Sequence, residues 1–235
     1  MSDLTEEQKI LLEYNWLESV AASEYGVDSP FYSQFGDLID LLSTQIERRE
    51  KARQQLKEIE YHRIPVEGTS WVRLEANHPD EEVITIYMDS ESEATEGISC
   101  AILVTLSNSL QRLKKNFVDP EKKIFEIGPK IGASFWAASI IAAANYARHK
   151  DEWLEMSSKL KSPNNLQSPN VKVLTDAGVA DPWSGNVSLL EVVTCLQVNQ
   201  WDSLITNLTE WLSACLPFHP SYNSKGNSSC NDENL

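Results

Sequence analysis

The chain has 235 residues, 41% of them hydrophobic, and a formal net charge of −15. This is enough for one large or two small domains with a hydrophobic core. The charge opposes general nucleic-acid binding, which needs clustered lysine and arginine. The four widely spaced cysteines match no zinc-ligand pattern, and we expect no metal and no cofactor. The acidic start, MSDLTEEQKI, has no basic segment before an apolar run, so we expect a cytoplasmic protein.

Charge is distributed unevenly along the chain. No Lys or Arg lies between Arg73 and Arg112, whereas residues 75–96 contain eight acidic side chains. Such a run predicts a strongly negative face. A basic segment follows it, and we take Lys114 and Lys115 as candidate binding residues within this positive patch.

The N-terminal part predicts two helices. Apolar residues recur every three or four positions between residues 5 and 25, which is typical of an amphipathic helix. A second helix is expected to begin with Ser29 as its N-cap and Pro30 in its first turn. Its apolar stripe ends at Ile46. We expect the charged continuation over residues 47–60 to project into solvent or to contact a partner chain.

An inserted β-hairpin is expected at about residues 70–88. The runs SWVRLE and EVITIYM are rich in β-branched and aromatic residues and flank the turn-forming sequence NHPD. A helical stripe then returns over residues 98–117, where large apolar residues recur at helical spacing.

A buried central helix is expected at about residues 131–150. Residues 131–147 are apolar or small on every side, which indicates either a helix buried all round or one that enters a membrane. The stretch is short for a membrane span and is mostly Ala rather than Leu, so we favour close helix packing in a soluble core without membrane contact. The fold class is therefore mainly α, a helical bundle around this helix with the inserted hairpin.

The C-terminal part predicts a polar connection followed by two helices. Ser188 and Glu191 have the spacing of a capping box at the start of the first helix, and a strong amphipathic stripe marks the second. The chain then divides into a helical core with the hairpin (1–160), a loop or linker (161–180), a helical pair that packs on the core (181–218) and a disordered tail (219–235).

The sequence NYARHKDEW holds the best candidate site. On a helix, Asn145, Arg148, His149 and Glu152 share one side. An imidazole next to a guanidinium can act as a general acid or base while the arginine holds a phosphate. The structural alternative is that these charges mark a helix end that leaves the core, where Asn145 bonds a neighbouring helix and the cations complement the helix dipole.

NYARHKDEW, together with the preceding helix SCAILVTLSNSLQRLKKNF, resembles the HEPN superfamily over residues 98–160. The resemblance implies an all-α fold that dimerises, in toxin and phage-defence proteins of bacteria, some of them metal-independent ribonucleases. Their catalytic signature is an arginine followed four to six residues later by a histidine. Here Arg148 and His149 are adjacent, so only these two residues carry over, and a non-catalytic member is the more natural interpretation.

These observations predict a non-enzymatic binding or assembly protein of a prokaryotic accessory or defence type. We expect a homodimer or a complex with a protein partner, in which Asn145, Glu152, Lys114 and Lys115 are candidate binding residues. The alternative is an HEPN-like ribonuclease that uses His149 and Arg148, and nucleic acid is a partner only in that case.

Overall fold

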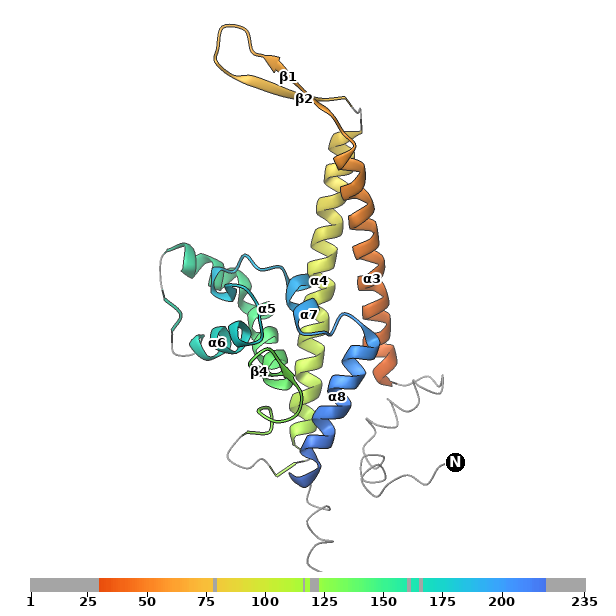
Figure 1. Cartoon of the computed structure of the whole chain (residues 1–235), viewed down its shortest axis with the longest axis vertical. Helices are drawn as coiled ribbons and strands as arrows, with labels where there is room; N and C mark the ends of the chain where they lie inside the picture. Colours follow the sequence, from red (N-terminus) through yellow and green to blue (C-terminus); the bar gives the residue numbers. More distant parts are fainter. Residues whose placement is uncertain are drawn as a thin grey trace, which may run out of the picture.

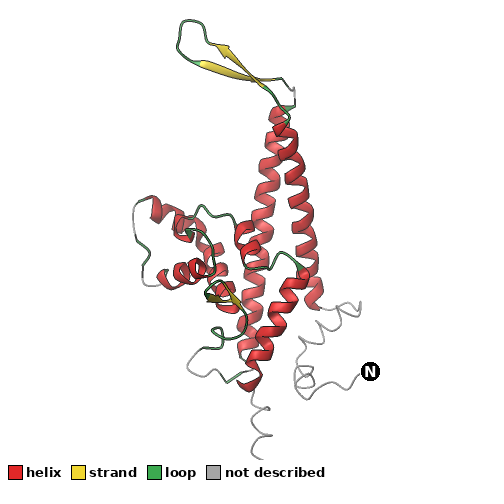
Figure 2. Cartoon of the chain, in the orientation of Figure 1, coloured by secondary structure: helices red, strands yellow, loops and turns green. Residues whose placement is uncertain are grey.

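The computed structural model describes residues 30–77, 80–115, 117–118, 123–159, 162–164 and 167–218. The helix expected over 5–25, the N-cap Ser29 and the tail over 219–235 lie outside these residues. The helices are α3 (Pro30–Lys57), α4 (Glu81–Lys114), α5 (Trp136–Ser158), α6 (Ser168–Asp176), α7 (Leu189–Cys195) and α8 (Trp201–Cys215), with 3₁₀ turns η2 (Pro182–Ser184) and η3 (Leu216–Phe218). The strands are β1 (Tyr61–Pro65), β2 (Val72–Ala76), β3 (Lys130–Ile131) and β4 (Ser134–Phe135). The predicted class, mainly α with an inserted hairpin, is confirmed (Figure 2).

Helices α3 and α4 form an arm that carries the β1–β2 hairpin at its far end (Figure 1). The 34 residues of α4 correspond to a length of about 51 Å at 1.5 Å per residue. The C-terminal half of α4 belongs to the core, since Ile102, Leu106 and Leu110 are fully buried. Residues 47–57 continue α3 as expected, and Ala52 is buried while most of its neighbours are exposed.

The hairpin lies earlier in the chain than the sequence predicts. Strands β1 and β2 pair antiparallel, with Tyr61 opposite Ala76 and Pro65 opposite Val72. Residues 82–88, expected to be the second strand, are instead the first turns of α4. Acidic residues at the start of this helix complement its dipole, and packing of α4 along α3 outweighs the β-propensity of the β-branched residues.

The central helix α5 begins five residues later than expected. Residues 130–131 and 134–135 form the small β3–β4 sheet, and Gly132 between them has a φ of +58°. A Cβ at Gly132 would come within 2.4 Å of the backbone oxygen of Asp176, so the chain turns tightly here against the end of α6. From Trp136 onward α5 is largely buried and contacts α4, α6 and α8, as a central bundle helix should.

The C-terminal elements complete the core. Helix α6 occupies part of residues 161–180, which the sequence predicted to be a loop or linker. Ser188 caps α7 by accepting a hydrogen bond from the Glu191 backbone N–H at 3.1 Å, as its spacing predicted. The stripe of α8 is buried, and the Trp211 indole donates to the carbonyl of Ile124. Of the helices in the described part of the chain, none combines the length and apolar character that crossing a membrane requires.

Candidate functional site

The polar end of α5 borders a cavity of about 280 Å³ that faces the start of α6. Three residues of the predicted site, Asn145, His149 and Glu152, take part in its lining. The full lining consists of Asn145, His149, Glu152, Trp153, Asn164, Gln167 and Asn170. The cavity is therefore rich in amide side chains, with one imidazole, one carboxylate and the indole of Trp153.

His149 lies against a carboxylate of its own helix. Its Nδ1 lies 3.2 Å from Oε2 of Glu152, and the two side chains are 49% and 68% exposed. A carboxylate next to one ring nitrogen orients an imidazole and favours one tautomer, which suits proton exchange at the other nitrogen. Because both groups are well exposed, the pair contributes less than about 1 kcal/mol to stability.

Arg148 does not take part in the cavity lining. Its Nη2 donates to Oδ1 of Asn108 on α4 at 3.2 Å, and its Nη1 donates to Oδ1 of Asn145 at 3.4 Å. Asn145 in turn donates to Oδ1 of Asn170 on α6 at 3.5 Å, the upper limit for a hydrogen bond. Arg148 and Asn145 thus connect α5 to two neighbouring helices, and Arg148 points to α4 while His149 borders the cavity.

The other side of this helix end is fixed to the core. Lys150 pairs with Oε2 of Glu96 on α4 at 2.8 Å, and Oε1 of Glu96 accepts the backbone N–H of Leu189 at the start of α7. The Tyr146 hydroxyl donates to the carbonyl of Val187 at 2.8 Å. Burial, then the nearby carboxylate of Glu96, raises the pKa of the Tyr146 hydroxyl well above its usual value. The sequence did not indicate Glu96, which holds three elements together here.

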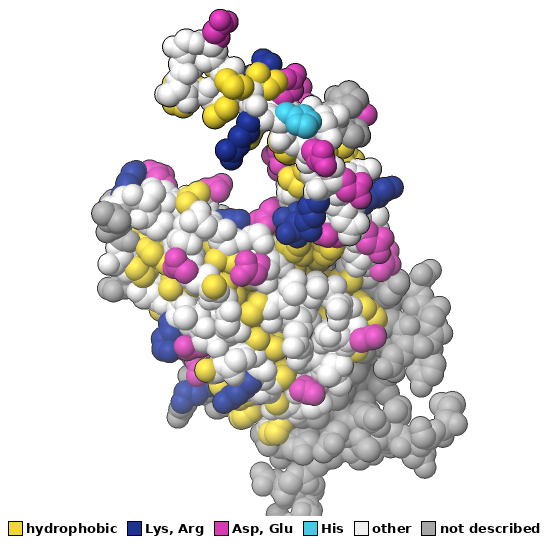
Figure 3. Space-filling view, turned by 45° about the horizontal axis from the view of Figure 1, so that its top comes forward, with side chains coloured by type: hydrophobic (Ala, Val, Ile, Leu, Met, Phe, Trp, Pro, Cys, Tyr) yellow, Lys and Arg dark blue, Asp and Glu magenta, His cyan; other side chains and the backbone are white. Residues whose placement is uncertain are grey.

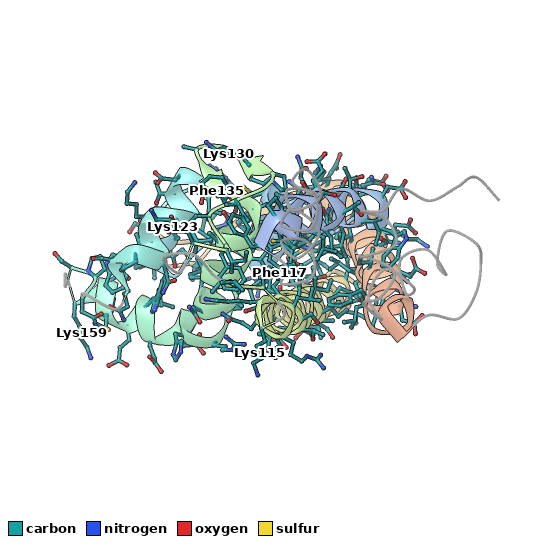
Figure 4. The ribbon with its side chains drawn as sticks, turned by 90° about the horizontal axis from the view of Figure 1, so that it is seen from below. Lys115, Phe117, Lys123, Lys130, Phe135 and Lys159 are labelled. Atoms are coloured by element: carbon teal, nitrogen blue, oxygen red, sulfur yellow. The ribbon has the colours of Figure 1, made fainter. Side chains whose placement is uncertain are left out.

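Lys114 and Lys115 lie at the C-terminal end of α4 and are not part of the cavity lining. The Lys114 Nζ is 5.1 Å from the centroid of the Phe125 ring, a cation–π contact. Lys115 is exposed and projects away from the core when the molecule is viewed from below (Figure 4). The structure therefore separates these two candidate binding residues from the candidates on α5.

A second candidate surface lies on the hairpin. Five of its large apolar side chains are exposed, and we call them the hairpin patch: Trp71 (76%), Leu74 (62%), Val72 (53%), Tyr61 (47%) and Val66 (41%). Hydrophobic side chains lie on the outside of this ribbon in the space-filling view (Figure 3). Monomeric proteins seldom expose such groups together unless they bind a partner. The sequence correctly predicted a strand through Trp71, Val72 and Leu74, but it paired that strand with residues 82–88 rather than with β1, so the patch was not foreseen.

Three amides of the cavity, Asn164, Gln167 and Asn170, were also missed. Their three-residue spacing in a segment expected to be a linker was the available signal. Asn164 and Gln167 each accept the other's backbone N–H, at 3.0 and 3.1 Å, which holds the turn that precedes α6. Within the described ranges, no group of three or more His, Cys, Asp or Glu side chains is arranged to hold a metal ion.

The chain matches no protein-family model, no curated protein and no solved structure.

Proposed function

We propose that the chain is a non-enzymatic binding or assembly protein of the HEPN-like, prokaryotic accessory or defence type, which works in the cytoplasm. Its arm presents the hairpin patch to a protein partner. The observation that carries this proposal is the exposure of five large apolar side chains on a ribbon at the end of the arm.

The alternation of the strands gathers much of the patch on one face. Tyr61 is opposite Ala76 and Pro65 is opposite Val72, so these four residues and Leu74 lie on the same side of the ribbon. A two-stranded hairpin alone in water is marginally stable at best. Burial of a large apolar side chain contributes about 1.5–3 kcal/mol, so a partner that covers this face stabilises both the complex and the hairpin.

The charge of the arm tip restricts the partner. Residues 58–90 have a formal net charge of −6; the hairpin itself, over 61–76, has two Glu and two Arg residues, so the negative charge lies beside it, on residues 58–60 and 80–89. Phosphate groups of nucleic acids and of anionic lipids are repelled by such a surface. A protein with an apolar patch surrounded by Lys and Arg fits it, since complementary charge accelerates association and disfavours other partners.

Site-specific photo-cross-linking in the cells that make the protein tests this proposal. A photoreactive amino acid at position 71 or 74 should yield a discrete protein adduct. The matched control is position 154 on α5, where Leu154 is also apolar and 40% exposed. Absence of an adduct from 71 and 74, or an equal adduct from 154, would overturn the role of the hairpin.

The alternative function, a metal-independent ribonuclease, draws its support from the His149–Glu152 pair beside the cavity. In that case His149 acts as general acid or base and Arg148 must turn from Asn108 toward the substrate. Purified protein is incubated with labelled RNA in EDTA. Cleavage that disappears in His149→Ala would establish the nuclease and refute a non-enzymatic role, whereas intact RNA supports the binding protein.

A further inference from the structure

The hairpin is a sheet of two strands, so each strand has one open edge. In the described part of the chain, β1 pairs with β2 and no further strand joins them. The ribbon lies at the far end of the arm, away from helices α5 to α8 (Figure 1). A small sheet usually needs a third strand, or a helix packed on it, to be stable by itself. The open edges are therefore where this ribbon can gain backbone hydrogen bonds from a partner.

The register determines which backbone groups face outward. The Val66 N–H donates to the carbonyl of Trp71 at 3.0 Å, and the Asn77 N–H donates to the carbonyl of Glu60 at 2.9 Å. Opposite pairs in an antiparallel ladder alternate between hydrogen-bonded and non-hydrogen-bonded. Counting inward from these two bonded pairs gives the pairs whose N–H and C=O groups face outward: Tyr61–Ala76, Arg63–Leu74 and Pro65–Val72.

The two edges are not equally open. Pro65 occupies an outward position of β1 and has no N–H, so it takes no bond from the ribbon but weakens this edge as a template. At the other end of β1 the Tyr61 hydroxyl donates to Oε1 of Glu81 at 2.9 Å, so the first turn of α4 lies near that end. All three outward positions of β2 retain both an N–H and a C=O. The edge of β2 is therefore the better template for a further strand.

We infer that an extended segment of a partner protein adds to the outer edge of β2 as a third strand. The inference rests on the proposed function, because it states how the hairpin holds its partner. The backbone groups of residues 72, 74 and 76 bond to the added segment, and the ribbon becomes a three-stranded sheet. In this mode the backbone bonds supply affinity, while the alternating side chains select the sequence.

The two faces of β2 define the chemistry of the segment. Val72 and Leu74 are exposed on one face, which favours a β-branched or aromatic neighbour on the added strand. On the other face Arg73 Nη2 lies 3.5 Å from Glu75 Oε2, in a pair exposed enough to exchange partners. A lysine or arginine opposite Glu75 and a carboxylate opposite Arg73 complement this face. The segment thus alternates apolar and charged residues.

The charge beside the ribbon favours a basic partner over a second copy of the chain. Residues 58–90 have a formal net charge of −6. Two copies paired edge to edge would bring two such regions together, and these regions repel each other. Lysine or arginine residues that flank the added segment are attracted instead, most strongly at low salt.

Proline substitution tests which edge is used, with the photoreactive p-benzoylphenylalanine at position 71 in every variant. Leu74→Pro removes one outward N–H and places a ring on the edge of β2, so the adduct yield should fall at least about twentyfold. Leu74→Val is the matched control, because valine and proline have the same number of side-chain carbon atoms; its yield should stay within about fourfold of the parent. Arg63→Pro makes the same backbone change opposite Leu74, on β1, and should also stay within about fourfold.

The outcomes separate this inference from the proposed function. Equal adduct yields from Leu74→Pro and Leu74→Val would overturn strand addition and leave the hairpin patch as a docking surface. An adduct of twice the mass of the chain would show a second copy on the hairpin and would also overturn the inference. Absence of any adduct from positions 71 and 74 in the otherwise unchanged chain would refute the proposed function itself.

Residue-resolved hydrogen exchange tests the same edge without a proline. After addition of the purified protein recovered from the adduct, the amides of residues 72, 74 and 76 should slow at least about tenfold more than those of residues 61 and 63. Equal slowing at both edges would overturn the inference. In the free chain the amides of Ile64 and Arg73, which pair inside the ribbon, should be protected alike in Leu74→Pro and Leu74→Val. If the proline variant loses this protection, the exchange of the wild-type chain decides.

Discussion

Replacing Glu91 by Met should stabilise the protein. Glu91 lies on the buried side of α4 with 8% exposure, and its Oε2 is buried without a hydrogen-bond partner. A buried polar atom left unpaired costs about 1–3 kcal/mol, and an apolar side chain of similar shape removes that cost. The substitution also removes the hydrogen bond between Tyr87 and Glu91, which together with burial raises the pKa of Tyr87. Losing this bond costs less, because Tyr87 is 44% exposed and its hydroxyl can bond water instead.

The free energy of unfolding should therefore rise by about 1–2 kcal/mol, equivalent to about 0.5 M in the urea midpoint. Urea titrations followed by circular dichroism at pH 7 measure the change. Glu93→Met is the control, since Glu93 is exposed on the same helix and should alter stability by no more than about 0.5 kcal/mol. A urea midpoint for Glu91→Met at or below that of Glu93→Met would refute the claim that the unpaired, buried carboxylate of Glu91 destabilises the protein.

Four further substitutions probe the fold and the cavity. Gly132→Ala should lower stability by more than about 2 kcal/mol, because of its positive φ and a 2.4 Å backbone clash, whereas Gly97→Ala should raise it by about 0.5–1 kcal/mol; equal thermal shifts would contradict this. Tyr146→Phe should cost about 1 kcal/mol in urea unfolding. The raised pKa keeps the folded hydroxyl protonated, so wild-type stability should fall as pH rises past 10.0, and persistence of that slope in Tyr146→Phe would exclude this hydroxyl as its source. His149→Ala should change stability by less than about 1 kcal/mol, and a larger loss would show that its pair with Glu152 is structural.

The elements that were predicted well are those with long amphipathic stripes. The stripe over 98–117 falls in the buried half of α4, and the stripe of α8 and the Ser188 cap are where periodicity and capping rules place them. The hairpin was displaced because Val83, Ile84 and Ile86 have strand propensity, and only their packing in a helix beside α3 decides otherwise. Local preference cannot reveal such a tertiary contact.

The candidate site was predicted in part. Helical spacing correctly placed Asn145, His149 and Glu152 on one side, and they take part in one cavity. Spacing could not show that Arg148 turns to Asn108, forty residues earlier, because that depends on how α4 crosses α5. The sequence also did not predict that Trp71 is exposed, because a tryptophan in a strand is normally expected to be buried in the core.

Hydrogen exchange tests the central claim, that the hairpin is the docking surface for a protein partner, most directly. In the purified chain the amides of residues 61–76 should exchange far faster than those of α5, since the ribbon has little support of its own. After addition of the partner identified by cross-linking, exchange at 61–76 should slow at least about tenfold while residues 145–153 remain unchanged. Slowing at 145–153 without any change at 61–76 would contradict the account and move the site to the cavity.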